Sequence, residues 1–200
     1  MRHGETLWNR ERRFQGQRDS PLTGRGIAQM LAVGACLRRM LGDGLDAFEL
    51  VASPLGRAWQ SAVLVAEAAG LDPLGIRLEP LVQEISWGSW DGLTAAEIEA
   101  REPELWRRRL ADAFAEAPPN GGESRLHVLQ RARRWLSALP AGARILLVSH
   151  GTFGRALRCA YRDLPHASML EMDAPQTACF HLVDGREERI EVAEGEAPLR

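Results

Sequence analysis

The sequence predicts an α/β fold with a mostly parallel central sheet. Two short apolar segments, Phe48–Ala52 and Ile145–Val148, have the length and composition of buried strands, and each leads into a helical pattern. The second is apolar at every position, as is typical of a strand covered by helices on both faces. Strands that alternate with amphipathic helices favour a parallel sheet, because each helix returns the chain to the same edge.

The helical patterns follow in order along the chain. Thr23 is a suitable N-cap, and apolar residues then recur at helical spacing from Ile27 to Leu41. The preceding stretch, Arg10–Arg18, has no sustained period and is expected to be a long ordered loop. The remaining expected elements are helices at 58–69, around 129–139 and at 151–161, a short strand at 76–79, and a terminal hairpin at 177–192.

An excursion from the sheet is expected over about residues 93–120. The pattern is helical from Thr94 to Glu116 but is interrupted by Pro103, which indicates two helices. Pro118-Pro119-Asn120-Gly121-Gly122 then forms a turn. We expect these helices to form a lid.

Composition indicates one soluble domain over residues 1–200. The hydrophobic fraction is 45% and the charged fraction is 26%, which are ordinary values for a globular protein. The net charge of −2 argues against nucleic acid or an anionic membrane as partner. All 25 Lys-plus-Arg positions are arginine, so a phosphate site must use guanidinium, imidazole and backbone N–H groups.

The cysteines and the hydropathy pattern indicate a cytoplasmic protein. Cys36, Cys159 and Cys179 lack CxxC spacing, which argues against a disulfide framework and a structural zinc site. No apolar run of about 18 residues is present to span a bilayer, and no apolar N-terminal segment could serve as a signal peptide.

Arg57 and His150 lie where strands are expected to end, and a histidine beside an arginine opens the chain. His150 follows the apolar strand 145–148, and Arg57 lies in the first turn of the helix after strand 48–52. Ligands of open α/β sheets bind at this carboxyl edge, and helix N-termini there attract anions. His3 lies beside Arg2, whose guanidinium would depress the imidazole pKa and hold an anion. The alternative for His150 is a purely structural role, as a buried histidine whose hydrogen bonds are satisfied within the fold.

Five ordered blocks carry a family resemblance. They are Arg2-His3-Gly4-Glu5-Thr6-x-x-Asn9 with Gln15-Gly16, Ser53-Pro54-x-x-Arg57-Ala58, Glu84, Gly121-Gly122-Glu123-Ser124, and Val148-Ser149-His150-Gly151. Together they resemble branch 1 of the histidine phosphatase superfamily, the phosphoglycerate mutase-like branch, from residue 1 to about residue 155. The resemblance implies a three-layer α/β/α sandwich.

The resemblance also implies roles for individual residues. His3 would be the nucleophile that becomes a phosphohistidine, and Glu84 would be the proton donor, although Glu79, Glu97 and Glu99 lie nearby in the sequence and Glu84 could be a solvated loop acid. Arg2, Arg57 and the His150 imidazolium would surround the phosphoryl oxygens. The implied phosphate- or substrate-binding set is Arg2, Asn9, Gln15, Gly16, Arg57, Glu84, His150 and Gly151.

The implied activity is that of a phosphatase acting on a small phosphorylated metabolite without metal or cofactor. Only 38 residues separate Glu84 from Glu123, whereas mutases of this family shield their phosphoenzyme with a long insertion and a C-terminal tail. A cofactor-dependent phosphoglycerate mutase is the enzymatic alternative. A non-catalytic module that binds phosphate esters is the alternative of another class, and a homodimer is a further expectation.

One departure from the family pattern concerns the first strand. Members of the family have an apolar strand immediately before the Arg-His pair, whereas this sequence places only Met1 there. A missing central strand would expose two sheet edges and remove apolar burial. We therefore expect a short apolar segment upstream of Met1 in the complete protein.

Overall fold

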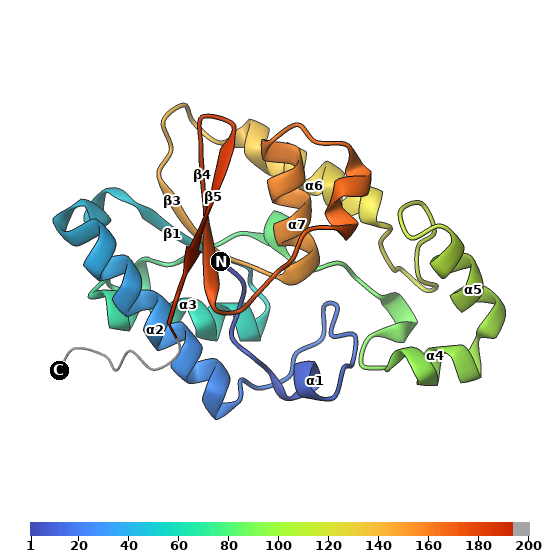
Figure 1. The fold of residues 1–200 in the computed structure, drawn as a ribbon. Helices are drawn as coiled ribbons and strands as arrows, with labels where there is room; N and C mark the ends of the chain where they lie inside the picture. Colours follow the sequence, from blue (N-terminus) through green and yellow to red (C-terminus); the bar gives the residue numbers. More distant parts are fainter. Residues whose placement is uncertain (194–200) are drawn as a thin grey trace.

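The computed structural model describes residues 1–193, and its centre is a parallel sheet of three strands in the order β2-β1-β3 (Figure 1). These strands are β1 (Glu49–Ala52), β2 (Arg77–Leu78) and β3 (Ile145–Val148). Leu50 lies opposite Leu146, and Val51 lies opposite Arg77. An antiparallel hairpin of β4 (Ala178–Val183) and β5 (Arg186–Glu191) forms a separate sheet. The expected mostly parallel sheet and terminal hairpin are confirmed.

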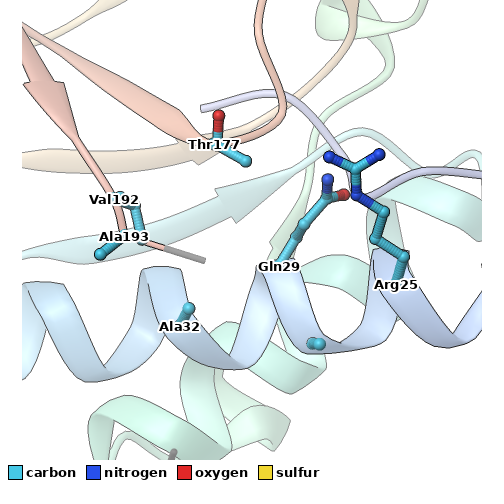
Figure 2. A pocket seen from close by; sticks show the side chains of 7 residues that line it. Arg25, Gln29, Ala32, Thr177, Val192 and Ala193 are labelled. Atoms are coloured by element: carbon cyan, nitrogen blue, oxygen red, sulfur yellow. The ribbon is translucent and has the colours of Figure 1, made fainter. Parts of the chain in front are cut away.

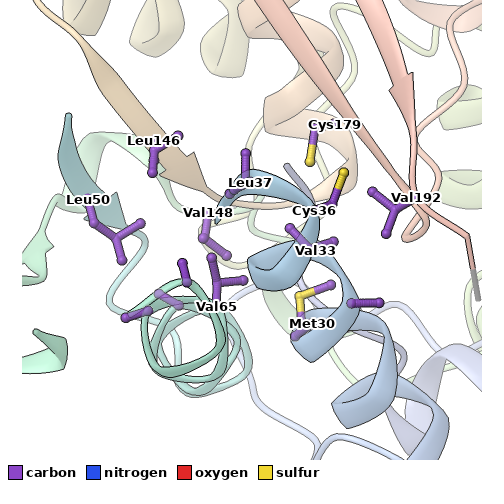
Figure 3. Close-up of a cluster of buried hydrophobic side chains, with 14 of the residues drawn as sticks. Met30, Val33, Cys36, Leu37, Leu50, Val65, Leu146, Val148, Cys179 and Val192 are labelled. Carbon is purple, nitrogen blue, oxygen red and sulfur yellow. The ribbon is translucent and has the colours of Figure 1, made fainter. Parts of the chain in front are cut away.

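Helices cover both faces of the parallel sheet. Leu146 and Val148 of β3 belong to a core cluster with α2 (Gly24–Leu41) and α3 (Gly56–Ala69), as Figure 3 shows. The alternate side chains, Ile145 and Leu147, pack against the cluster that contains α6 (Arg125–Ala138) and α7 (Gly151–Tyr161). Because successive side chains of a strand point to opposite faces, this division confirms the α/β/α layering.

Side-chain caps fix where the principal helices begin. Thr23 accepts a hydrogen bond from the backbone N–H of Gly26, as its N-cap position predicts. Ser124 and His127 form a reciprocal capping box at the start of α6. The same motif between Thr6 and Asn9 begins α1 (Leu7–Arg10), a single turn that precedes the expected loop. Short 3-10 helices occur at Gly42–Ala47, Pro73–Gly75, Pro80–Val82, Gly88–Trp90 and His166–Leu170.

The expected excursion contains two helices that lie away from the sheet (Figure 1). They are α4 (Ala95–Arg101) and α5 (Pro103–Ala111). Pro103 occupies the first turn of α5, where its missing N–H has no intrahelical partner to lose. Across residues 1–193, no helix combines the length and the apolar character that crossing a bilayer requires.

The first three residues run beside β3. Arg2 forms a parallel bridge with Ser149, and the backbone N–H of His3 donates to the Ser149 carbonyl at 2.9 Å. The Met1 amino group donates to the carbonyl of Leu147 at 2.8 Å. Burial lowers the pKa of this amino group. The chain therefore reaches His3 as a strand would.

A large cavity continues from Met1 along the same edge of β3. Its volume is about 630 Å³, and it lies between β3, the β4-β5 hairpin and the adjacent helices. Leu147, Leu182 and Trp135 contribute to its largely apolar lining. The cavity has the position and the lining that an apolar strand preceding Arg2 would need. The expected upstream segment remains a prediction.

A much smaller cavity, of about 130 Å³, lies between α2 and the end of the hairpin (Figure 2). Gln29 and Ala32 line it from α2, and Thr177 and Val192 line it from the chain flanking the hairpin. Gln29 also accepts the backbone N–H of Glu5 through Oε1, at 3.0 Å. This region thus connects the hairpin, α2 and the segment that follows His3.

Joining an apolar extended segment of about six residues to Met1 is expected to stabilise the fold. Each buried Val or Ile contributes about 1.5–3 kcal/mol, so we expect the free energy of unfolding to rise by about 3 kcal/mol or more. A peptide bond would also replace the buried amino group. Urea unfolding measures the effect, with a Gly/Asp extension of equal length as control. Equal stability of the two extended proteins would contradict the prediction.

Candidate active site

The ends of three chain segments bring His3, Arg57 and His150 together. His3 follows the residues paired with β3, Arg57 lies in the first turn of α3 after β1, and His150 precedes α7 after β3. Arg57 Nε–H donates to His3 Nε2 at 3.3 Å, and the two imidazole centroids are 5.3 Å apart. All three side chains are buried. The site lies at the carboxyl edge of the parallel strands.

The hydrogen bonds of His3 determine its tautomer. Nδ1 lies 2.8 Å from the carbonyl oxygen of Gly4, which can only accept, so Nδ1 carries the proton. Nε2 therefore has a lone pair, and the Arg57 N–H points at it. Burial, followed by the charges of Arg57 and Arg2, lowers the pKa of His3 well below its usual value. The ring is therefore neutral at pH 7, with its lone pair on Nε2.

Arg57 is held in place by the loop that follows α1. Its Nη1 donates to the Arg18 carbonyl at 2.7 Å and to Asp19 Oδ1 at 2.9 Å, and its Nη2 donates to the Gly16 carbonyl at 2.7 Å. Asp19 also accepts the backbone N–H groups of Gly56 and Arg57, which begin α3. The Asp19 carboxylate thus orients Arg57 and caps its helix. Sequence reasoning did not single out Asp19, which lies 38 positions from Arg57.

Gly16 and Asp91 join this loop to the segment before α4. Gly16 has a φ of +52°, and a Cβ there would lie 1.7 Å from Asp91 Oδ1. Asp91 accepts the backbone N–H groups of Trp87 at 3.0 Å and Gln17 at 3.3 Å. Burial raises the pKa of Asp91. Only glycine fits the close approach that lets the Gly16 carbonyl reach Arg57.

His150 occupies the N-cap position of α7. Its Nε2 is 2.7 Å from Ser53 Oγ, while Nδ1 is buried and has no partner within residues 1–193. Burial, followed by the charges of Arg57, His3 and Arg2, lowers the pKa of His150 well below its usual value. The expected imidazolium is therefore wrong for the protein alone, because a buried imidazole among cations is neutral.

Arg2 lies close to the first turn of α7. Its Nη1 donates to the Ala174 carbonyl at 2.8 Å, and its Nε is buried without a partner in the described part of the chain. A Cβ on Gly151 would lie 3.6 Å from Arg2 Cζ and 3.7 Å from Glu84 Oε2. Gly151 thus lies between the Arg2 guanidinium and the Glu84 carboxylate. In the described part of the chain, Arg2 Nε–H is still able to donate a hydrogen bond.

Glu84 reaches the N-terminus of α7. Its Oε2 accepts the backbone N–H of Thr152 at 3.0 Å, and its Oε1 accepts that of Phe153 at 3.1 Å. These are N–H groups without an intrahelical acceptor, and a carboxylate at a helix N-terminus interacts favourably with the helix dipole. Glu79 and Glu97 pair instead with Arg77 and Arg13. Of these three acids, only Glu84 bonds to α7.

Arg131 holds the segment that carries Glu84. It donates to the carbonyls of Leu81, at 2.7 Å, and Gln83, at 3.0 Å, and pairs with Glu123 at 2.8 Å. Glu123 also accepts the backbone N–H of Ser86 at 3.0 Å. Sequence reasoning placed Glu123 in a motif block but missed Arg131, which lies 47 positions from Glu84.

Two expected binding residues have no bond to this cluster. Asn9 Oδ1 accepts from the Thr6 backbone N–H and from Gln176 Nε2. Gln15 Oε1 is buried and has no partner in the described part of the chain. Within residues 1–193, neither side chain bonds to His3, Arg57 or His150. The same part of the chain contains no group of three metal-ligating side chains.

Comparison with known proteins identifies the family. The model described as "Histidine phosphatase superfamily (branch 1)" matches residues 1–196. The chain belongs to this branch. Its similarity therefore extends beyond the five motif blocks to the hairpin.

Individual relatives carry different names. A "Probable phosphoglycerate mutase GpmB" of Escherichia fergusonii is 38% identical over 154 residues, which cover 76% of this chain and 67% of that protein. A mycobacterial glucosyl-3-phosphoglycerate phosphatase structure is 29% identical, with a TM-score of 0.70 over 96% of this chain and 95% of the other. A putative α-ribazole-5′-P phosphatase of Escherichia coli is 23% identical, with a TM-score of 0.80 over 96% and 93%, and supports the fold alone.

The two neutral histidines are expected to make stability depend on pH. Both folded pKa values lie below the usual 6.5, so the unfolded chain binds more protons below that pH. The free energy of unfolding should therefore fall as pH decreases below 6.5, by about 1.4 kcal/mol per pH unit for each histidine. Urea unfolding from pH 5 to 7.5 measures this slope. His150→Asn should reduce it and exposed His181→Asn should not; an unchanged slope in His150→Asn would contradict the assignment.

Removing the Asp19 carboxylate is expected to destabilise the fold. Asp19→Ala would leave two N–H groups of α3 uncapped and the buried Arg57 without its carboxylate, at a cost of about 1–3 kcal/mol. Thermal or urea unfolding measures the loss. Asp43→Ala removes an exposed carboxylate beside Arg38 and should change stability by less than about 0.5 kcal/mol. Similar effects of the two substitutions would argue against the proposed role of Asp19 in binding Arg57 and capping α3.

Proposed function

We propose that this protein is a phosphatase that hydrolyses a small phosphomonoester through a phosphohistidine on His3. The observation that carries the proposal is the fixed tautomer of His3, with Nδ1 bound to Gly4 and a neutral Nε2 beside Arg57. A protonated imidazole has no lone pair with which to attack phosphorus. Burial and two neighbouring guanidinium groups keep this nitrogen unprotonated at neutral pH.

In the first step, Nε2 attacks phosphorus while the bond from phosphorus to the ester oxygen breaks. The transferring group carries its charge on three equatorial oxygens, which need cations and N–H donors. Arg2 and Arg57 supply the cations, and the neutral imidazole of His150 supplies an N–H. Arg2 Nε and His150 Nδ1 are buried without partners in residues 1–193, which supports their availability to a ligand. Placing His150 Nδ1–H towards the ligand requires Nε2 to accept from Ser53 Oγ–H.

Glu84 is the proposed proton donor to the departing alkoxide. Its two oxygens accept N–H groups of α7, and a carboxyl group that carries a proton accepts fewer hydrogen bonds. Donation therefore requires one oxygen to leave its backbone partner. In the second step, water attacks the phosphohistidine, Glu84 takes the proton of that water, and inorganic phosphate leaves as Nε2 regains its lone pair.

The alternative of a phosphoglycerate mutase rests on the name of the Escherichia fergusonii relative. A mutase must return the phosphoryl group to the substrate before water attacks the phosphohistidine. The short segment between Glu84 and Glu123 favours hydrolysis, because it offers few residues with which to exclude water. The glucosyl-3-phosphoglycerate phosphatase among the similar structures also supports hydrolysis.

A phosphoryl group transferred to the protein is expected to be found on His3. Rapid acid-free quenching with a ³²P-labelled phosphomonoester should trap a labelled protein that is stable to base and labile to acid. His3→Ala should abolish the label and reduce phosphate release by about 10⁴-fold or more, because the covalent route is lost. His181→Ala, an exposed histidine on β4, serves as the control and should retain both.

Product analysis distinguishes the candidate functions. Release of inorganic phosphate from most turnovers supports the phosphatase, while interconversion of 2- and 3-phosphoglycerate without release would identify a mutase. Ligand binding with no label on His3 would leave the non-catalytic binding module as the function.

A further inference from the structure

A single peptide unit connects His3 to helix α2. The carbonyl oxygen of Gly4, which lies 2.8 Å from His3 Nδ1, belongs to the peptide bond between Gly4 and Glu5. The N–H of the same peptide bond, that of Glu5, donates to Gln29 Oε1 at 3.0 Å. This bond is trans, so its C=O and N–H point in opposite directions and the unit lies between the two side chains. One hydrogen-bonded path therefore runs from Gln29 to His3.

Gln29 is buried on the face of α2 that meets the start of the chain. It is 6% exposed and follows Gly26, which lies in the first turn of the helix. A Cβ on Gly4 would lie 2.3 Å from the Gly26 carbonyl oxygen, so only glycine allows the two backbones to come this close. Residues three apart lie on the same face of a helix, which places Gln29 beside the segment that follows Gly4. The backbone contact thus sets the distance over which Gln29 reaches the Glu5 N–H.

The neighbouring peptide units have partners of their own. The N–H of Gly4 donates to Ser61 Oγ at 3.1 Å, and the carbonyl of Glu5 accepts the backbone N–H of Thr23 at 2.8 Å. Loss of the Gln29 acceptor would therefore release the unit between them without releasing either neighbour. The orientation of the Gly4 carbonyl depends on the Gln29 side chain for this reason.

Two hydrogen bonds define the orientation of the His3 ring. Arg57 Nε–H binds at Nε2, and the Gly4 carbonyl binds at Nδ1. Arg57 alone favours the tautomer with a lone pair on Nε2, but a bond at one nitrogen leaves the ring free to turn about that contact. The Gly4 carbonyl removes this freedom. Donation from the Glu5 N–H to Gln29 also polarises that carbonyl and strengthens it as an acceptor.

We propose that Gln29 is a positioning residue for the nucleophile, and that it acts through the Gly4–Glu5 peptide to hold the His3 ring with Nε2 towards the phosphorus atom of the substrate. The role of Nε2 as nucleophile rests on the proposed function, whereas the position of the ring does not. Hydrogen-bond partners one step removed act in the same way on metal-bound imidazoles, where their loss costs about 10- to 100-fold in affinity or activity.

A purely structural role for Gln29 would give a different result on substitution. In that case the amide only satisfies a buried N–H, and its loss lowers the stability of the fold without changing the surroundings of His3 Nδ1. The positioning role instead requires the hydrogen bond of Nδ1–H to depend on the acceptor at residue 29. The two roles are separated by a measurement made on the His3 ring itself.

Nuclear magnetic resonance of the full-length protein with ¹⁵N-labelled histidine makes that measurement. His3→Ala assigns the Nδ1–H signal of His3 by its absence. Gln29→Met removes the acceptor at nearly constant side-chain length and should broaden the signal and speed its exchange with water, while Gln29→Glu keeps an acceptor oxygen and should retain it. Val33→Ala, one turn further along α2 and also buried, is the matched control for lost stability and should leave the signal unchanged.

Hydrolysis of p-nitrophenyl phosphate gives a second readout. Its nitrophenolate leaves without a proton from Glu84, so kcat/KM reports attack by His3. We expect kcat/KM to fall about 10- to 100-fold in Gln29→Met and to recover in part in Gln29→Glu, with inhibition by inorganic phosphate changed by less than about twofold. Val33→Ala should keep most of the activity.

Hydrogen exchange in the unsubstituted protein tests the inference without any variant that must fold. One rotation of the peptide unit breaks both bonds, so the Glu5 N–H and the His3 Nδ1–H should be protected to the same extent. Independent exchange of these two protons would overturn the inference, as would an Nδ1–H signal that is the same in Gln29→Met and Val33→Ala. Absence of a phosphoenzyme would defeat the proposed function instead, because neither resonance measurement depends on turnover.

Discussion

The contact between Arg57 and His3 is the interaction on which the candidate site depends. It places a buried cation against the lone pair of Nε2, which opposes protonation of that nitrogen. A guanidinium can hold that position only if its other donors are bound. The carbonyls of Gly16 and Arg18 and the carboxylate of Asp19 bind them. The order of the 16–19 loop therefore supports the contact between Arg57 and His3.

The same electrostatics favour a dianionic ligand. Arg2 and Arg57 are both buried, and burial lowers the pKa of each. The free energy of folding therefore already includes part of the cost of removing these charges from water. Arg57 has one carboxylate partner, Asp19, and a phosphoryl group would add further negative charge beside both guanidinium groups. The arrangement that keeps His3 neutral in the protein alone is thus the arrangement that would stabilise negative charge on phosphorus-bound oxygens.

Features that depend on neighbouring residues could be predicted from the sequence, whereas features that depend on contacts between residues far apart in the sequence could not. Strand β3, the Thr23 cap and the position of Arg57 after β1 follow from local patterns of hydrophobicity and capping. The roles of Asp19 and Arg131 do not, because these residues meet their partners across 38 and 47 positions and no spacing rule connects them. The neutral state of His150 was also unpredictable, since it depends on burial among cations from separate segments.

The position of His3 finally depends on how the start of the chain pairs with β3. Hydrogen bonds from Met1 and His3 to the carbonyls of Leu147 and Ser149 align the chain with the strand that delivers His150. Both imidazoles are therefore set by one register, and a slip of one residue would turn His3 to the opposite face. The apolar cavity lies directly beyond Met1 on the same edge. Fraying of these bonds would therefore move Nε2 away from Arg57.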